Sequence, residues 1–362
     1  MKRSRFSEER FRIFAVVDDY SRECVRLIAD TSISGARVER ELNAAVFERM
    51  ARRIQSGHQR PHPNSPMAKN VWRRYLRGMI KRLILAAFLA LAGCNAPALP
   101  GAVLVQHPDD PAANIEYFVQ RPTGDGPWPT VIFLHGHQPD LQSAGGRAFV
   151  DWGVLSRFAD EGYLAVAISL PGYGNSTGPR DFAGPYTQNA VLAVLEQLEN
   201  EKQAMPDRIA IQGTSLGAVT AALIGAQEHD LAGLVLISGL YDLSAFFEQR
   251  DSFAAKSIRA TAIAQTSGDA DALRSRTALY VAGKIKAKTL ILNGALDERT
   301  DPSQAVSLAQ RINAAGGNAT AQIFPNAGHQ IPLVDRDERI HAFIEAVLNP
   351  ESAADTAKDS QK

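Results

Sequence analysis

Residues 208–224 read Arg-Ile-Ala-Ile-Gln-Gly-Thr-Ser-Leu-Gly-Ala-Val-Thr-Ala-Ala-Leu-Ile, and this stretch decides the fold. An apolar run ends in Gly-x-Ser-x-Gly and a small-residue run of helical length follows, which predicts a strand, a sharp turn and a helix. Glycines two residues either side of Ser215 let strand and helix pass closely, because they carry no Cβ. We expect Ser215 to stand exposed at the end of a strand. A plain turn between buried elements would look the same, so the rest of the chain must decide.

The turn would also place a hydrogen-bond donor beside the serine. The backbone amide of Leu216 is expected at the helix N-terminus, where an unpaired donor and the positive end of the helix dipole favour a developing oxyanion. A serine hydroxyl is a poor nucleophile until an imidazole takes its proton, and the imidazole needs a carboxylate to fix its tautomer. The reading of Ser215 as a nucleophile therefore requires a histidine and an acid on later loops.

From Ala102 onward, apolar runs of strand length alternate with helical patterns. Predicted strands cover residues 103–106, 115–120, 130–134, 164–170, 208–212, 231–237, 289–292 and 320–324. Predicted helices cover residues 148–160, 187–199, 217–227, 302–314 and 335–347. Continuous apolar strands that alternate with helices predict an α/β fold, with a mostly parallel sheet covered by helices on both faces.

Two loops of this predicted sheet carry the partners that Ser215 needs. Asp297 follows the strand at 289–292, and His329 follows the strand at 320–324. Parallel strands bring their carboxyl ends to one edge of a sheet, so both loops are expected beside Ser215. The chain order serine, aspartate, histidine is the one expected of an α/β-hydrolase. We therefore predict a catalytic triad of Ser215, Asp297 and His329.

The acid has alternatives close in the sequence. Glu298 and Asp301 lie in the same loop as Asp297, and Asp301 could instead cap the helix predicted from Pro302. Asp242, after the strand at 231–237, is a further acid position. Asp297 is preferred because it stands three residues after Gly294, close to the end of its strand.

The strand at 130–134 ends in His135-Gly136-His137-Gln138. In this type of fold the loop after that strand supplies the second oxyanion donor, so the backbone amide of His137 is expected beside that of Leu216. Both histidine side chains are expected to be structural. Residues 170–176 (Leu-Pro-Gly-Tyr-Gly-Asn-Ser) form a tight loop at the same edge and are expected to shape the pocket wall.

Residues 102–349 resemble the α/β-hydrolase superfamily, nearest to its dienelactone-hydrolase-like and prolyl-oligopeptidase-like branches. The resemblance rests on Phe133-Leu134-His135-Gly136, Pro171-Gly172-Tyr173-Gly174, the nucleophile elbow Gly213-Thr214-Ser215-Leu216-Gly217, Ala282-Gly283-Lys284-Ile285-Lys286-Ala287 leading to Asn293-Gly294-Ala295-Leu296-Asp297, and Ala327-Gly328-His329.

This resemblance implies a serine hydrolase. The chain departs from prolyl oligopeptidases because no segment is large enough for their propeller, and from dienelactone hydrolases because their nucleophile is a cysteine. Cleavage of small-molecule carboxylic esters or related acyl compounds is the preferred function. A serine-type peptidase acting on short peptides and a non-catalytic binding lipoprotein are the alternatives. Attack on a carbonyl needs only the triad and two amides, so no metal or organic cofactor is expected.

Residues 241–288 interrupt the alternation and read as a helical cap over the active-site edge. Long excursions of this kind are usually functional. Its apolar residues could bury against the sheet edge and leave an apolar acyl slot near Ser215. The alternative is a structural helix pair packed away from the site. The apolar residues in question are Leu240, Leu243, Phe246, Phe247 and Phe253.

The first 78 residues differ in charge from the rest: they carry 17 Lys+Arg against 9 Asp+Glu, whereas residues 95–362 carry 20 against 30. Residues 6–49 predict two strands and a helix over residues 35–50, and resemble a fragment of an insertion-sequence transposase core. The fragment offers Asp18 and Asp19 but lacks the further carboxylates that such a nuclease needs for its metal ions. We therefore expect residues 1–78 to be a remnant, and no nucleic-acid partner.

Residues 79–94 change character abruptly, with a basic start, a short apolar run and the ending Leu-Ala-Gly-Cys. This pattern resembles a bacterial lipoprotein signal peptide, which implies that the protein starts at Met79 and that Cys94 is lipidated. Asn95 after the cysteine implies a membrane-anchored protein of the cell envelope, on the outer membrane facing the periplasm. An internal apolar helix that ends at a chance cysteine is the alternative, and mass spectrometry of the native protein would distinguish the two.

Residues 95–101 are expected to be a tether, and residues 350–362 a disordered polar tail. The chain contains two cysteines, Cys24 and Cys94, and neither lies in the predicted hydrolase domain. A disulfide framework or thiolate metal site in that domain is therefore excluded.

Overall fold

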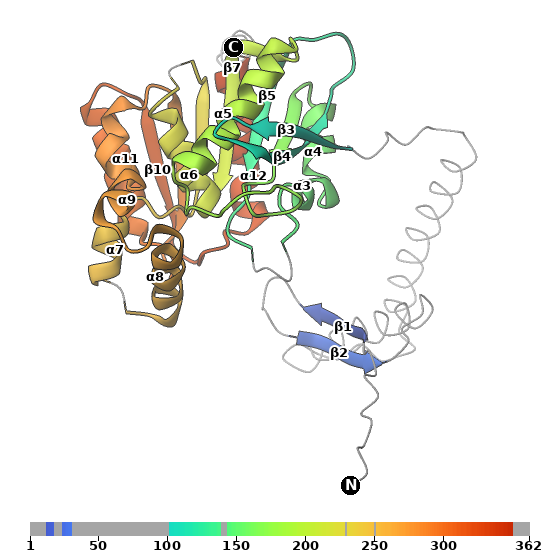
Figure 1. Ribbon diagram of the computed structural model, residues 1–362. Helices are drawn as coiled ribbons and strands as arrows, with labels where there is room; N and C mark the ends of the chain where they lie inside the picture. Colours follow the sequence, from blue (N-terminus) through green and yellow to red (C-terminus); the bar gives the residue numbers. More distant parts are fainter. Residues whose placement is uncertain are drawn as a thin grey trace, which may run out of the picture. The chain divides into compact units, whose positions relative to one another are not determined.

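The computed structural model describes residues 12–17, 24–30, 101–138, 143–228, 230–249 and 251–349. The chain divides into two compact units, residues 1–96 and 97–362. In the first unit, β1 (Arg12–Val17) pairs with β2 (Cys24–Asp30) in antiparallel fashion, as Figure 1 shows. The helix at 35–50, the signal at 79–94 with Cys94, the tether up to residue 100 and the tail lie outside the described residues, and these assignments stay predictions.

The second unit is built on one eight-stranded sheet with the order β10-β9-β8-β7-β5-β6-β4-β3. Strand β4 pairs in antiparallel fashion with β3 and β6, and all other neighbours are parallel. The mostly parallel sheet predicted from the sequence is therefore confirmed. The strands are β3 (Ala102–His107), β4 (Asp110–Gln120), β5 (Trp128–Leu134), β6 (Leu164–Ile168), β7 (Ala204–Thr214), β8 (Gly233–Ile237), β9 (Lys288–Gly294) and β10 (Ala319–Phe324).

Helices cover both faces of the sheet (Figure 1). One apolar core includes residues of α5 (Pro185–Asn200), α6 (Leu216–Gly225) and α11 (Pro302–Ala314). The other core includes residues of α3 (Arg147–Asp151), α4 (Val154–Asp160) and α12 (Leu333–Leu348). Neighbouring residues of β5 face opposite cores: Ile132 and Leu134 belong to the first, Val131 and Phe133 to the second. Burial on both faces explains why the strands read as continuous apolar runs.

The predicted helix at 148–160 is in fact two helices, α3 and α4. The chain breaks at Trp152 and Gly153, and Gly153 takes a φ of 70°, a left-handed conformation that glycine adopts without a Cβ penalty. The other predicted helices of this unit lie where expected, and α11 has the predicted bounds. The apolar pattern continued across the glycine, so periodicity alone did not reveal the break.

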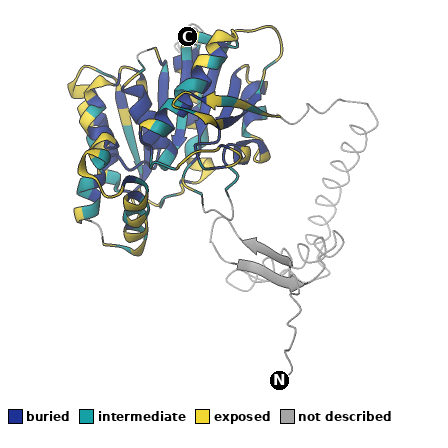
Figure 2. Cartoon of the chain, in the orientation of Figure 1, coloured by how far each residue is buried: buried dark blue, intermediate teal, exposed yellow. Residues whose placement is uncertain are grey.

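Residues 241–288 are helical, as predicted. They contain α7 (Leu243–Gln249), α8 (Phe253–Thr266), α9 (Ala270–Ser275), α10 (Ala278–Val281) and the short 3-10 helix η2 (Ala282–Lys284). Figure 2 shows that the strands in the middle of the sheet are largely buried, whereas β3 at its edge is mostly exposed or half-buried; the buried residues of α8 are Ala255, Ala262 and Thr266. Within the described part of the chain, no helix combines the length and the hydropathy that a membrane crossing needs.

Candidate active site

Ser215 is the single residue between β7, which ends at Thr214, and α6, which begins at Leu216. Its backbone has a φ of 55° and a ψ of −114°, a conformation that costs a residue with a Cβ about 1–3 kcal/mol. The backbone N–H of Ser215 donates to the carbonyl oxygen of Ile237 at the end of β8, at 2.7 Å. The neighbouring strand thus holds the serine in this conformation.

The two glycines of the motif are required by close backbone contacts. A Cβ on Gly213 would lie 2.1 Å from the carbonyl oxygen of Gly217, and a Cβ on Gly217 would lie 2.3 Å from that of Leu134. Neither contact can relax by a side-chain movement, because both partners are backbone atoms. The sequence-based reason for the glycines, a close passage of strand and helix, therefore agrees with the structure.

The structure brings the three predicted triad residues together. His329 Nε2 lies 3.1 Å from Ser215 Oγ, and His329 Nδ1 lies 2.9 Å from Asp297 Oδ2. Asp297 follows β9 and His329 follows β10, so parallel strands deliver both to the edge at which Ser215 stands. The Asp297 side chain is fully buried, and that of His329 is 15% exposed. The histidine can therefore receive a proton on the side of the serine while its other nitrogen is held.

Asp297 is surrounded by hydrogen-bond donors. Its Oδ1 accepts from the backbone N–H groups of Arg299 at 2.8 Å and Thr300 at 3.0 Å, and its Oδ2 accepts from the Thr300 hydroxyl at 2.5 Å. The Asn293 amide also donates to Oδ2, at 3.4 Å. Burial alone would raise the pKa of Asp297, but the hydrogen bonds and charge of His329 together with the bonds from Thr300 outweigh it and leave the pKa lowered. Asp297 therefore stays ionised and orients the imidazole.

The alternative acids lie elsewhere. Asp301 caps α11, since its side chain accepts from the backbone N–H of Ser303 at 2.9 Å, as the sequence suggested. Asp242 similarly accepts from the N–H of Ala245 at the start of α7, at 3.0 Å. The structure therefore favours Asp297 over both as the partner of His329.

The loop after β5 runs directly against the serine. A Cβ on Gly136 would lie 3.1 Å from Ser215 Cβ, so a larger residue would crowd the nucleophile. The next residue is His137, whose Nδ1 lies 2.9 Å from the Tyr173 hydroxyl. Leu216 is the first residue of α6, directly after Ser215, and His137 follows Gly136, so the two predicted oxyanion residues lie on segments that meet at Ser215.

His135 is structural, as expected from the sequence. It is 3% exposed; its Nδ1 donates to the carbonyl oxygen of Gly136 at 2.7 Å, and its Nε2 accepts from the N–H of Leu170 at 3.1 Å. Burial lowers the pKa of His135 to about 4, although the bond to Gly136 opposes this. A neutral imidazole therefore joins the loop after β5 to the loop after β6.

The cap helix α8 is anchored at both ends to loops of the sheet edge. Ser252, which caps its N-terminus, donates its hydroxyl to the carbonyl oxygen of Glu298 at 3.2 Å. Near its C-terminus the side-chain oxygen Oε1 of Gln265 accepts from the backbone N–H of Phe182 at 2.8 Å. The 14 residues of α8 make a helix roughly 21 Å long. The sheet has four strand-to-strand spacings between β9 and β6, which together measure roughly 19 Å. The helix is thus long enough to cross the edge that carries Ser215.

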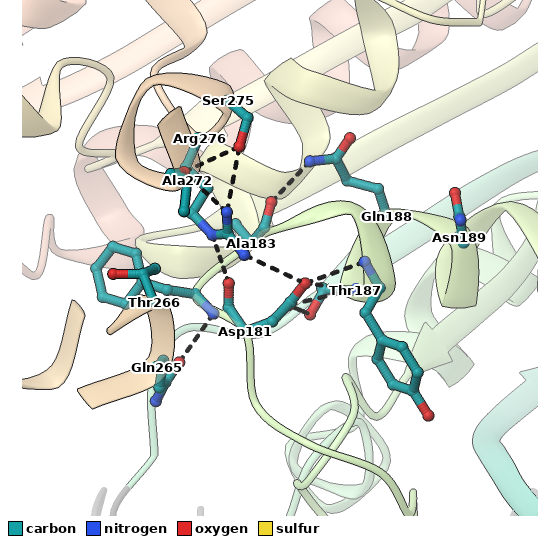
Figure 3. Close-up of polar contacts among 12 residues, drawn as sticks. Asp181, Ala183, Thr187, Gln188, Asn189, Gln265, Thr266, Ala272, Ser275 and Arg276 are labelled. Carbon is teal, nitrogen blue, oxygen red and sulfur yellow. Dashed lines mark hydrogen bonds and ion pairs between the residues drawn. The ribbon is translucent and has the colours of Figure 1, made fainter. Parts of the chain in front are cut away.

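A buried arginine makes a second attachment of the cap (Figure 3). The Arg276 side chain follows α9 and donates its Nε to the carbonyl oxygen of Asp181 at 2.6 Å, while its Nη2 lies 3.7 Å from Asp181 Oδ2. The same carboxylate accepts from Tyr186 N and Thr187 N in the first turn of α5. Asp181 therefore connects the cap to a helix of the main domain.

The apolar residues of the cap have different environments. Leu240, Leu243 and Phe246 are buried in the core that contains α5, α6 and α11, whereas Phe253 is 90% exposed. Phe247 is half-buried, and the Arg259 guanidinium carbon lies over its ring, 5.6 Å from the ring centre of Phe247. Phe246 is therefore buried, as expected, but its side chain is part of the core and does not itself line an acyl slot.

Sequence reasoning missed several residues that support the site. Thr300 and Asn293, which hold Asp297, have no motif of their own, and Glu116 on β4 lies far from the motifs in the chain. Only their position next to the triad or its loops identifies them. Among the described residues, no group of three His, Cys, Asp or Glu side chains could hold a metal ion.

A sequence model of the prolyl oligopeptidase family matches residues 151–351, more than half of the chain and a range that includes Ser215, Asp297 and His329. Among curated proteins, Protein ABHD14A of Mus musculus is 27% identical over 111 residues, which are 31% of this chain and 41% of that protein. The chain thus spans about two fifths of the length of the curated relatives that it matches.

Solved structures show the same fold. A puromycin-hydrolyzing peptidase of Mycobacterium tuberculosis superposes with a TM-score of 0.59 and 20% identity, over 70% of this chain and 40% of that one. An acetyl xylan esterase of Paenibacillus sp. R4 gives a TM-score of 0.55 and 19% identity, over 68% of this chain and 83% of that one. These likenesses and the sheet order confirm the predicted α/β-hydrolase fold.

Proposed function

Because the chain belongs to the prolyl oligopeptidase family, we propose that this serine hydrolase cleaves carboxylic esters or related acyl compounds through Ser215, His329 and Asp297. The observation that carries the proposal is the line of hydrogen bonds from Asp297 through His329 to Ser215, with distances of 2.9 and 3.1 Å. The strained backbone at Ser215, held by Ile237, supports the assignment of the nucleophile.

The geometry suggests the following course of the reaction. His329 Nε2 takes the hydroxyl proton of Ser215 as the serine oxygen attacks the substrate carbonyl, and Asp297 stabilises the imidazolium that forms. The backbone amides of Leu216 and His137 bind the oxyanion of the tetrahedral intermediate. His329 then gives the proton to the leaving group, which departs from an acyl-Ser215 enzyme. Water activated by His329 hydrolyses that ester and restores the serine.

Esters come before peptides as substrates because of what the superpositions cover. The superposition covers 83% of the acetyl xylan esterase but 40% of the puromycin-hydrolyzing peptidase, so the part that is shared with the esterase is nearly a whole enzyme. The alternative, a serine peptidase that accepts short peptides, is supported by the family match itself.

A fluorophosphonate probe tests the nucleophile. The purified protein is expected to be labelled, the Ser215→Ala variant is expected to stay unlabelled, and Ser307→Ala on α11 serves as the matched serine control. A folded wild type that resists the probe would overturn the proposal. A panel of p-nitrophenyl esters of increasing acyl length, run beside aminoacyl anilides, then separates the esterase from the peptidase, because only a peptidase should prefer the anilides.

A further inference from the structure

Glu116 is a buried carboxylate on β4 that the proposed reaction does not use. Its residue is 1% exposed. Its Oε2 accepts from the Ser169 hydroxyl at 2.7 Å and from the Asn175 N–H at 3.1 Å, and its Oε1 accepts from the Asn175 side-chain amide at 2.5 Å. Within the described residues, the ion pairs include none with Glu116. A buried carboxylate without a cation has a desolvation cost that an apolar side chain would not have, so stability explains it poorly.

Two glycines close on the pair formed by Glu116 and Ser169. Gly174, with a φ of 56°, approaches so closely that a Cβ there would lie 2.5 Å from Glu116 Oε2. Gly145, with a φ of 57°, would place a Cβ 2.3 Å from Ser169 Oγ, and the next amide, that of Gly146, donates to the same oxygen at 2.9 Å. The segment after β5 and the loop after β6 therefore both pack closely against Glu116 and Ser169.

The same two segments meet again at the catalytic edge. The Tyr173 hydroxyl, one residue from Gly174, lies 2.9 Å from His137 Nδ1. Tyr173 is 2% exposed and its ring meets that of His135 edge to face, with centroids 4.8 Å apart. A shift of the loop around Gly174 would therefore move Tyr173, and with it the segment that carries His137.

We propose that Glu116 is a positioning residue for the oxyanion hole. Its carboxylate holds the loop at residues 170–176 against β4, and this loop fixes the backbone amide of His137 beside Ser215 through Tyr173. The inference rests on the proposed function, because it takes the His137 amide as an oxyanion donor. A carboxylate suits the task since it accepts from three donors at once, whereas a glutamine would turn an amide NH2 group toward one of them.

Comparison of an ester with its thionoester tests the inference. Sulfur accepts hydrogen bonds more weakly than oxygen, so a displaced oxyanion hole should slow the ester more than the thionoester. Glu116→Gln is expected to lower kcat/KM for the ester by about tenfold, and to reduce the ester-to-thionoester rate ratio by about the same factor. This is less than the roughly 10²–10³-fold loss of kcat that follows when an oxyanion-hole donor is removed altogether. Thr289→Val is the control. It removes a buried hydrogen bond at the start of β9, the end far from Asp297, and should keep the wild-type ester-to-thionoester ratio.

An unchanged ratio in Glu116→Gln, with both rates falling in proportion to the folded fraction or not at all, would overturn the inference. A wild type that turns over neither compound and resists the fluorophosphonate would overturn the proposed function and the inference together. Should Glu116→Gln fail to fold, Asn175→Ala removes one donor to the same carboxylate from an exposed residue and is expected to lower the ratio in the same direction.

Discussion

The two sides of Ser215 are built in different ways. On the side of β9 and β10, three side chains touch one another, and Asp297 and His329 follow directly from the ends of their strands. On the side of β5 and β6, backbone loops converge, and the contacts that place them run through glycines and the buried Glu116. The difference teaches that a group of interacting side chains can be located from residue types, whereas the position of a backbone amide depends on the contacts that support its loop.

The largest expected effect is on kcat, and it tests the side of β9 and β10, where Asp297 and His329 lie. Asp297→Asn should lower kcat by about 10⁴-fold, because the imidazole loses the carboxylate that fixes its tautomer. Asp301→Asn is the matched control: it should leave kcat near the wild-type value and change stability by less than about 0.5 kcal/mol, since asparagine caps a helix about as well as the aspartate that caps α11. Steady-state kinetics and urea unfolding measure the two effects. The reverse pattern would assign the acid to Asp301.

The cap touches both sides, and its phenylalanines should separate scaffold from surface. Phe246→Ala should cost about 3–5 kcal/mol of unfolding free energy, because the side chain is 1% exposed in the core. Phe253→Ala, at 90% exposure, should change stability by less than about 0.5 kcal/mol. Urea denaturation measures both. Equal losses would show that the first turn of α8 is packed in solution.

A change of pH should act on the side of β5 and β6 through His135. Because burial lowers the pKa of His135 from 6.5 to about 4, the unfolded chain binds a proton between these values that the folded chain does not bind. Stability should therefore fall as pH decreases through this window, by about 2 kcal/mol between pH 7 and pH 5. The pKa of Asp297 is lowered, so its contribution is present above the ordinary value of 3.8 and is lost only in stronger acid.

Urea unfolding at pH 7 and pH 5 measures this effect, and His135→Gln is the control. The variant keeps polar atoms between Gly136 and Leu170 but cannot titrate, so its loss of stability over the same range should be smaller than that of the wild type by about 2 kcal/mol. Equal losses in the two proteins would contradict the role given to His135.

The fold and the meeting of Ser215, Asp297 and His329 could be predicted because both depend on local patterns. Strands buried on two faces read as apolar runs, and the glycines around Ser215 report a backbone contact that excludes a Cβ. The sequence could bring Asp297 and His329 together because parallel strands have their carboxyl ends at one edge of the sheet. The break at Gly153 was hidden by an apolar pattern that continues on both sides of it.

What the sequence could not show depends on contacts between distant segments. Glu116 reads as one polar residue within the apolar run at 115–119, and its donors Ser169 and Asn175 lie more than fifty residues further along the chain. Arg276 and Asp181 lie still further apart, 95 residues, and in the sequence they look like surface charges. The sequence shows that Phe246 is apolar, but not whether its side chain contacts the core or a ligand.

The backbone conformation of Ser215 has a consequence for any laboratory selection of this protein. With a φ of 55° and a ψ of −114°, the position would suit glycine better than any residue with a Cβ. A library screened for heat resistance alone would therefore tend to enrich replacements that relax this position and remove the hydroxyl. The most durable chain would then lack the proposed nucleophile, so turnover has to be scored in the same screen.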